Sequence, residues 1–115
     1  MRVISGKLKG KKLFFLSPSI TRPLKDVVRE SVFNVLLHSN LINVSIENSK
    51  ILDLYSGTGS FGIECISRGA KKVAFVENNK EAIEILNKNL KNLLIKNKAS
   101  LFTEKVESFL NQVDK

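Results

Sequence analysis

The sequence predicts an α/β fold with a doubly wound parallel sheet, and three observations support this fold class. From residue 50 onward, short apolar segments alternate with segments whose apolar residues recur every three or four positions, the pattern of strands followed by helices. The segments "KILDLY" and "KKVAFVE" do not alternate between polar and apolar residues, as is typical of strands covered on both faces. A glycine-rich turn, "SGTGSFG", connects the first of these strands to a helix.

Residues 1–49 are predicted to form a basic N-terminal extension. The segment 2–16, "RVISGKLKGKKLFFL", is typical of a β-hairpin whose two short strands flank Gly6 and Gly10. After a loop that contains both prolines, the segment 24–39, "LKDVVRESVFNVLLHS", has its valines and leucines on one helical stripe. We therefore expect a hairpin and then a helix before the sheet.

Residues 50–115 are predicted to form the first three strands of the sheet, each followed by a helix. Gly69 is expected to end the first of these helices, since glycine readily adopts the left-handed conformation that closes a helix. The second helix carries leucine and isoleucine side chains on one face. The expected strands are 50–55, 71–77 and 100–104, and the expected helices are 60–68, 79–94 and 105–113.

The composition is that of one globular domain without a membrane span. The chain has 115 residues, 43% of them hydrophobic, and its apolar runs are far too short to cross a bilayer. No apolar segment of signal-peptide type follows the basic N-terminus. The lone cysteine, Cys65, excludes an internal disulfide, so a reducing, cytoplasmic location is expected. We expect Cys65 to be a small packed hydrophobe.

Positive charge is concentrated at the N-terminus. The formal net charge is +8, and residues 1–25 carry seven basic side chains and no acidic one. Such an arm is typical of a surface that binds nucleic acid, although lysines also keep hairpins soluble without binding anything. A membrane surface is less favoured, because no long amphipathic helix accompanies the charge. The candidate RNA-binding residues are Arg2, Lys7, Lys9, Lys11, Lys12, Arg22, Lys25 and Arg29.

The glycine-rich turn indicates a nucleotide site, and an acid before it indicates which kind. The spacing G-x-G-x-x-G is common in dinucleotide-binding proteins, where amides at a helix start bind a diphosphate. Asp53, four residues before Gly57, would repel a diphosphate in a partly desolvated crevice. S-adenosylmethionine (SAM) instead carries a sulfonium and an ammonium. The sequence therefore favours SAM over NAD(P), with tight strand-to-helix packing as the alternative that needs no ligand.

Glu77 supports a nucleoside ligand. It ends the second predicted strand, 18 residues after Gly59, where a carboxylate is placed to accept from both ribose hydroxyls. Tyr55 lies within the turn and is expected either to line the pocket or to pack in the core. His38 has no histidine or cysteine nearby in sequence, so no metal site is predicted.

Three segments resemble a known family. "RVISGKLKGKKL", "TRPLKDVVRESVFNVL" and "ILDLYSGTGSFGIECISRGAKKVAFVENN" resemble, in that order, the N-terminal part of the bacterial small-subunit rRNA guanine-N2 methyltransferases of the RsmD type. The resemblance covers nearly the whole chain and implies SAM as cofactor and rRNA or the small ribosomal subunit as partner. By the resemblance, Lys105 and Val106 stand at the adenine contacts after the third strand, and since lysine cannot accept a hydrogen bond, the backbone at Val106 is the expected contact. By resemblance, the cofactor residues are Asp53, Ser56, Gly57, Thr58, Gly59, Glu77, Asn78, Lys105 and Val106.

The family's catalytic motif, Asn/Asp-Pro-Pro-aromatic after the fourth strand, is not found in these 115 residues. The resemblance therefore implies a truncated form, about three fifths of a typical member, that alone binds SAM weakly if at all and does not methylate. A non-catalytic RNA-binding module is the alternative, and an NAD(P)-dependent oxidoreductase is less favoured. Since the fourth strand of such sheets pairs with the first, the segment 50–55 is expected to be an exposed edge that promotes self-association.

Overall fold

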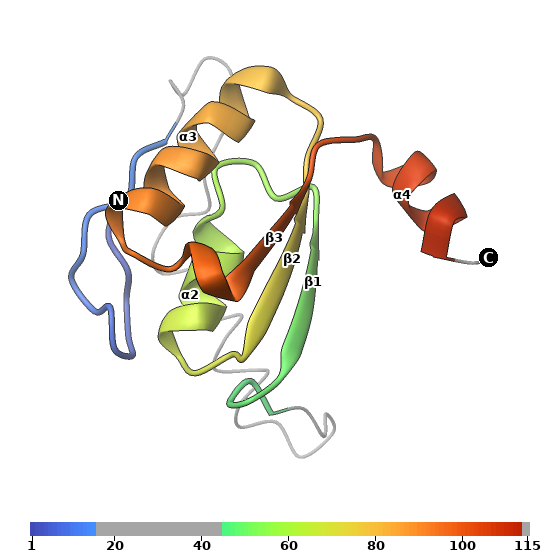
Figure 1. The fold of residues 1–115 in the computed structure, drawn as a ribbon. Helices are drawn as coiled ribbons and strands as arrows, with labels where there is room; N and C mark the ends of the chain where they lie inside the picture. The colour runs from blue at the N-terminus through green and yellow to red at the C-terminus, as the bar shows by residue number, and fades with distance from the viewer. Residues whose placement is uncertain (16–44, 114–115) are drawn as a thin grey trace.

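The computed structural model describes residues 1–15 and 45–113. Strands and helices alternate along the second of these ranges, which confirms the predicted α/β fold class (Figure 1). Boundaries differ from the predicted ones by no more than three residues. The elements are β1 (Lys50–Leu54), α2 (Ser60–Ser67), β2 (Lys72–Val76), α3 (Lys80–Asn92), a 3-10 turn η1 (Lys96–Lys98), β3 (Ala99–Phe102) and α4 (Val106–Val113).

The three strands form a parallel sheet in the order β1-β2-β3. In Figure 1, α2 and α3 lie on one face of this sheet and α4 lies on the other side. Val73 and Phe75 of β2 point toward α2 and α3 and are fully buried, with Ile63 and Leu86 in the same apolar cluster. Because side chains alternate along a strand, Asp53, which is in register with Phe75, points toward the same helices.

The opposite face of the sheet is less covered than the sequence predicts. Leu52 of β1 is 49% exposed, so the expectation that both faces are covered is wrong for this strand within the described residues. Packing on this face is found at the carboxyl ends of the strands. There Val76 packs with Val106 and Phe109 of α4, and the rings of Phe102 and Phe109 are 4.9 Å apart. The carboxyl edge of the sheet is therefore held by α4.

Residues that flank α2 and α3 explain where these helices end and begin. Gly69, at φ 107°, follows the end of α2 as predicted. Asn79 caps α3, since its side-chain oxygen accepts from the backbone N–H of Ala82 at 2.9 Å. Leu86 and Leu90 of α3 are buried on the face predicted from their spacing.

The N-terminal arm, residues 1–15, follows a hairpin path outside α2 and α3 (Figure 1). The two predicted strands are reduced to one antiparallel bridge between Arg2 and Lys12, because turns at the positive-φ residues Gly6 and Gly10 occupy most of the segment. Val3 and Leu13 are nevertheless buried in the same apolar cluster as α2 and α3. The predicted proline loop and the helix at 24–39 lie outside the described residues.

Candidate functional site

The loop after β1 bends sharply at three residues with positive φ. These are Tyr55 at 57°, Gly57 at 58° and Gly59 at 93°. A Cβ on Gly59 would lie 2.3 Å from Cδ1 of Leu86, so glycine lets α2 pack closely against α3. A Cβ on Gly57 would meet nothing within 4 Å. Open space thus lies against the backbone at Gly57, where a ligand can approach.

Ser56 ties the ends of β1 and β2 together. Its hydroxyl donates to the carbonyl oxygen of Asp53 at 2.6 Å and accepts from the N–H of Val76 at 3.0 Å. Its own N–H donates to the carbonyl oxygen of Val76 at 3.0 Å. Ser56 is buried, so its hydroxyl does not face solvent. These hydrogen bonds fix the conformation of the loop.

Glu77 holds the glycine-rich loop from the end of β2. Its Oε1 accepts from the N–H of Gly57 at 2.8 Å, and its Oε2 accepts from the N–H of Asn79 at 3.0 Å. A carboxylate offers about four acceptor positions, so each oxygen keeps capacity for a further donor. The residue predicted to bind a ribose therefore also sets the conformation of the loop.

Asp53 is a buried carboxyl with an unsatisfied oxygen. The residue is 8% exposed, and its Oδ2 has no hydrogen-bond partner. Burial raises the pKa of Asp53 from its ordinary 3.8 to about 6; a hydrogen bond from the Gly62 backbone lowers this pKa, and the charge of Glu77 raises it further. A donor or a cation reaching Oδ2 would satisfy the orphaned atom and favour the ionised form.

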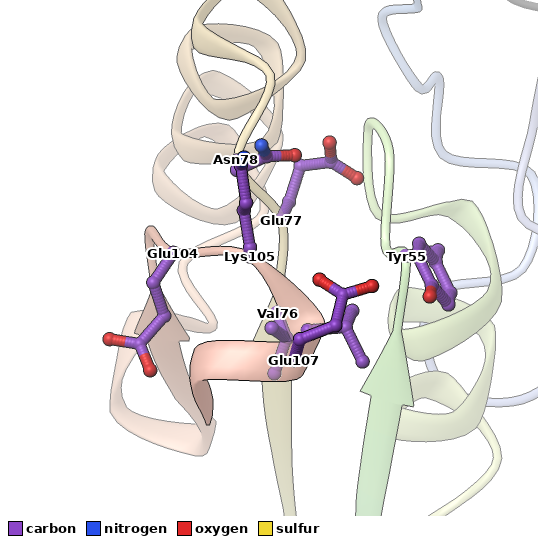
Figure 2. A pocket seen from close by; sticks show the side chains of 8 residues that line it. Tyr55, Val76, Glu77, Asn78, Glu104, Lys105 and Glu107 are labelled. Carbon is purple, nitrogen blue, oxygen red and sulfur yellow. The ribbon is translucent and has the colours of Figure 1, made fainter. Parts of the chain in front are cut away.

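A pocket of about 330 Å³ opens at the carboxyl edge of β1, β2 and β3. In Figure 2 the carboxylates of Glu77 and Glu107 stand between Tyr55 on one side and Glu104 on the other. Three carboxylates and one ammonium line this space, so its character is acidic. The lining residues are Tyr55, Val76, Glu77, Asn78, Glu104, Lys105, Val106 and Glu107.

The predicted cofactor residues fall into two adjoining groups. Those after β2 and β3 line the pocket, together with Tyr55, which is 71% exposed rather than packed in a core. Those of the loop shape it from the side, joined through the bond from Gly57 to Glu77. The pocket residues are Tyr55, Glu77, Asn78, Lys105 and Val106, and the loop residues are Asp53, Ser56, Gly57, Thr58 and Gly59.

Two acids of the pocket were not predicted. Glu104 and Glu107 flank Lys105, and Oε1 of Glu104 is buried without a partner. Neither belongs to a recognisable motif, but both lie near the carboxyl end of a predicted strand, where parallel sheets place their ligand crevices. Their position at the end of a predicted strand was the feature of the sequence from which they could have been predicted.

Five of the predicted RNA-binding residues lie on the arm and are exposed. Within the arm, Nη1 of Arg2 donates to the carbonyl oxygen of Gly10 at 2.7 Å. Arg22, Lys25 and Arg29 lie outside the described residues. The five are Arg2, Lys7, Lys9, Lys11 and Lys12.

Buried polar side chains of α2 clamp the arm in place. Glu64 is fully buried, and its two oxygens accept from the backbone N–H groups of Ile4 at 2.9 Å and Ser5 at 3.1 Å. Arg68 donates to the same carboxylate at 2.9 Å. The Ser67 hydroxyl accepts from the N–H of Leu8 at 2.9 Å. Sequence analysis missed this clamp, although an acid within the apolar run "GIECI" was a visible anomaly.

Asn89 of α3 joins the arm to the glycine-rich loop. Its Oδ1 accepts from the N–H of Phe14 at 2.8 Å, and its Nδ2 donates to the carbonyl oxygens of Phe14 at 2.9 Å and Thr58 at 3.0 Å. Asn89 is 1% exposed, so these bonds satisfy a polar side chain in the core. Sequence analysis also missed Asn89, whose signal was a polar residue on the apolar stripe of the helix.

Neither a reactive cysteine nor a metal site is supported in the described residues. Burial raises the pKa of Cys65 to about 12, and the charges of Asp53 and Glu64 raise it too, so the buried thiol stays protonated and serves as a packed residue. Residues 1–15 and 45–113 contain no group of three or more histidine, cysteine, aspartate or glutamate side chains placed to hold a metal ion. Over the same ranges, every helix is too short or too polar to span a bilayer.

The chain is similar to proteins of known family over its whole length. The family model described as "Conserved hypothetical protein 95" matches residues 1–115. YlbH of Bacillus subtilis is 36% identical over 115 residues, 100% of this chain and 59% of YlbH. Ribosomal RNA small subunit methyltransferase D of Haemophilus influenzae is 41% identical over 93 residues, 81% of this chain and 45% of that protein.

A solved structure has the same fold. The yhhF protein of Escherichia coli superimposes with a TM-score of 0.78 and 30% sequence identity, over 96% of this chain and 55% of yhhF. The chain thus spans between about half and three fifths of these relatives. Sequence and fold agree, and the chain belongs to the RsmD family of ribosomal RNA small-subunit methyltransferases.

Proposed function

We propose that these residues are the cofactor- and RNA-binding part of an enzyme that methylates the exocyclic N2 amine of a guanine in small-subunit rRNA. The observation that carries the cofactor assignment is the pocket lined by the carboxylates of Glu77, Glu104 and Glu107. Asp53, whose Oδ2 is buried without a partner, adds a further acid within electrostatic reach of Glu77. A cationic nucleoside matches this charge, whereas a diphosphate would meet carboxylates on several sides. SAM, when bound, supplies an electrophilic methyl group on its sulfonium.

The residues present fit SAM in four places. Glu77 keeps acceptor capacity for ribose hydroxyls beside its bonds to Gly57 and Asn79. Oδ2 of Asp53 is suited to accept from the ammonium group. The open space at Gly57 lets the ligand lie against the loop backbone. Tyr55 and Val106 supply apolar surface at the sides of the pocket.

Adenine recognition is proposed to depend on the β3–α4 segment. The ammonium of Lys105 cannot accept from the adenine amine, but the adjoining carboxylates of Glu104 and Glu107 can. The backbone of Val106 is the second candidate contact. Asn78, which is exposed at the rim, is proposed to lie next to the ribose.

The arm is proposed to contact rRNA in a cytoplasmic enzyme. Residues 1–15 carry five exposed basic side chains and no acidic one, which gives the arm a positive charge that attracts phosphates. Residues 1–49 would then act as the RNA-facing extension and residues 50–115 as the cofactor-binding half. The RNA-binding residues outside the described ranges, Arg22, Lys25 and Arg29, belong to the same proposal.

Self-association through β1 is also proposed. Among the described strands, β1 pairs with β2 on one side, and its other edge has no strand beside it. Such an edge, with Leu52 half exposed, can pair with a second copy of the chain. Light scattering should detect dimers or larger species as concentration rises; a strictly monomeric chain at high concentration would contradict this.

The experiment for the proposed function uses two proteins. The first is the 115-residue chain, which should bind S-adenosylhomocysteine and small-subunit RNA but transfer no labelled methyl group. The second is a chimera in which the part of YlbH beyond the matched region is joined to this chain. It should produce N2-methylguanosine, identified by mass spectrometry of digested RNA. Methylation at another base would contradict the guanine assignment.

A non-catalytic RNA-binding module is the second candidate. The concentration of exposed basic side chains on the arm, residues 1–15, favours it. The two functions differ in the first experiment. A module that recognises RNA shape alone should bind RNA without binding S-adenosylhomocysteine.

A further inference from the structure

Two lysines from distant parts of the chain meet at one aromatic ring. Nζ of Lys88, on α3, lies 4.1 Å from the centroid of the Phe14 ring, and Nζ of Lys12, on the arm, lies 5.8 Å from the same centroid. The two ammonium groups are therefore at most 9.9 Å apart, the sum of these distances. Both lysines are exposed, while Phe14 is half-buried.

The ring is held in place by the core beneath it. Asn89, the residue after Lys88, bonds to both the N–H and the carbonyl oxygen of Phe14. Leu13, the residue before Phe14, is 1% exposed in the main apolar cluster. Residue 14 therefore cannot move away from α3 without breaking buried contacts. Cation–π attraction, which is weak at exposed sites, favours positions of both ammonium groups near the ring.

The two charges lack an acidic partner. Within residues 1–15 and 45–113, neither Lys12 nor Lys88 forms an ion pair with a carboxylate. Glu84 lies one turn before Lys88 on α3, but it forms no ion pair with that lysine. Two exposed ammonium groups within 9.9 Å of each other create a local positive potential, which attracts an anion such as a phosphate.

We propose that Lys12, Phe14 and Lys88 form one binding site for the phosphate backbone of RNA, which extends the RNA-binding surface from the arm onto α3. This inference rests on the proposed function, in which the chain binds rRNA. The ring serves to position the ammonium groups. Because Lys88 already covers the ring at 4.1 Å, a stacked base is not the expected contact. The site therefore contributes to affinity independently of base sequence.

The test measures the affinity for a fluorescein-labelled RNA hairpin by anisotropy over a range of salt concentrations. Lys88→Ala should weaken binding and reduce the slope of log K against log salt by about 0.7 to 0.9. The reduction should be the same for hairpins of different sequence. The matched control is Lys72→Ala on β2, an exposed lysine that points to the opposite face of the sheet. It should leave affinity and slope unchanged.

A double-mutant cycle tests whether the two lysines act as one site. The loss of RNA-binding free energy in the double variant should be smaller than the sum of the losses for Lys12→Ala and Lys88→Ala, because each lysine contributes less to binding when the other is absent. Thermal melts should show that all variants remain folded. If Lys88→Ala behaves as Lys72→Ala while Lys12→Ala weakens binding, this site is wrong and the arm alone binds RNA. If the unaltered chain binds no RNA, both this site and the proposed contact between the arm and rRNA are wrong.

Discussion

The carboxylate of Glu77 accepts a hydrogen bond from the backbone N–H of Gly57 over 2.8 Å. This bond joins the end of β2 to the glycine-rich loop that follows β1, 20 residues earlier in the chain. One side chain thus shapes the loop and remains available to a ligand, so changes at Glu77 should affect binding more than folding.

Glu77→Gln is predicted to weaken S-adenosylhomocysteine binding about ten- to a hundredfold, the value of a hydrogen bond to a charged group. The glutamine carbonyl can still accept from Gly57, but its NH₂ cannot accept from Asn79 or from a ribose. Calorimetric titration measures the change. Glu81→Gln, an exposed acid on α3, is the control and should bind as the unaltered chain does. Equal affinity of both variants for S-adenosylhomocysteine would show that Glu77 does not contribute to ligand binding.

Asp53 should make the protein less stable as pH rises through the acidic range. The unfolded carboxyl ionises near 3.8, whereas the folded one keeps its proton to about pH 6. Stability from this group is therefore complete below about pH 4 and is lost by about pH 6, a change of roughly 3 kcal/mol. Asp53→Asn removes this dependence.

Urea unfolding of Asp53→Asn and the unaltered chain checks that sign. The free energy of unfolding of the variant, relative to the unaltered chain, should increase by up to about 3 kcal/mol between about pH 4 and about pH 7. A difference that stays constant with pH would show that Asp53 ionises normally in the folded state.

Asn89→Leu is predicted to destabilise the protein by about 2 to 4 kcal/mol. The change leaves the N–H and carbonyl oxygen of Phe14 and the carbonyl oxygen of Thr58 without their present partner. Asn92→Leu, at the exposed end of α3, should change stability by about 0.5 kcal/mol or less. Urea unfolding compares the two; similar losses would mean that the buried bonds of Asn89 contribute little.

Two glycines of the loop should respond differently to alanine. At Gly59, a Cβ would lie 2.3 Å from Leu86 at φ 93°, so Gly59→Ala should cost several kcal/mol and lower the melting temperature strongly. At Gly57, the added Cβ meets nothing, and the φ of 58° costs about 1 kcal/mol. Gly57→Ala should instead impair ligand binding, because the methyl group fills the open space. Equal melting temperatures for the two variants would contradict this.

The regular elements could be predicted because each rests on a local pattern. The apolar stripe of α3, the stop residue Gly69 and the apolar strand β2 are properties of short segments. The loop residues of the candidate site were likewise visible, since Asp53 and the glycines have fixed spacing. Such features do not depend on what the rest of the chain packs against.

The polar contacts between distant segments could not be predicted. Glu64 and Asn89 are buried because the arm docks on α2 and α3, and that docking depends on tertiary structure. Glu104 joins the pocket because β3 lies beside β2, again a long-range relationship. The same reason explains Leu52, whose exposure depends on what covers the far face of the sheet.

The central claim is that acidic side chains at the carboxyl edge of the sheet select a positively charged nucleoside. Calorimetric titration of the unaltered chain and of Asp53→Asn with SAM and with ADP tests it most directly. The unaltered chain should bind SAM at least about tenfold more tightly than ADP, and Asp53→Asn should weaken SAM binding and strengthen ADP binding. ADP binding as tight as that of SAM, unaffected by Asp53→Asn, would contradict the assignment.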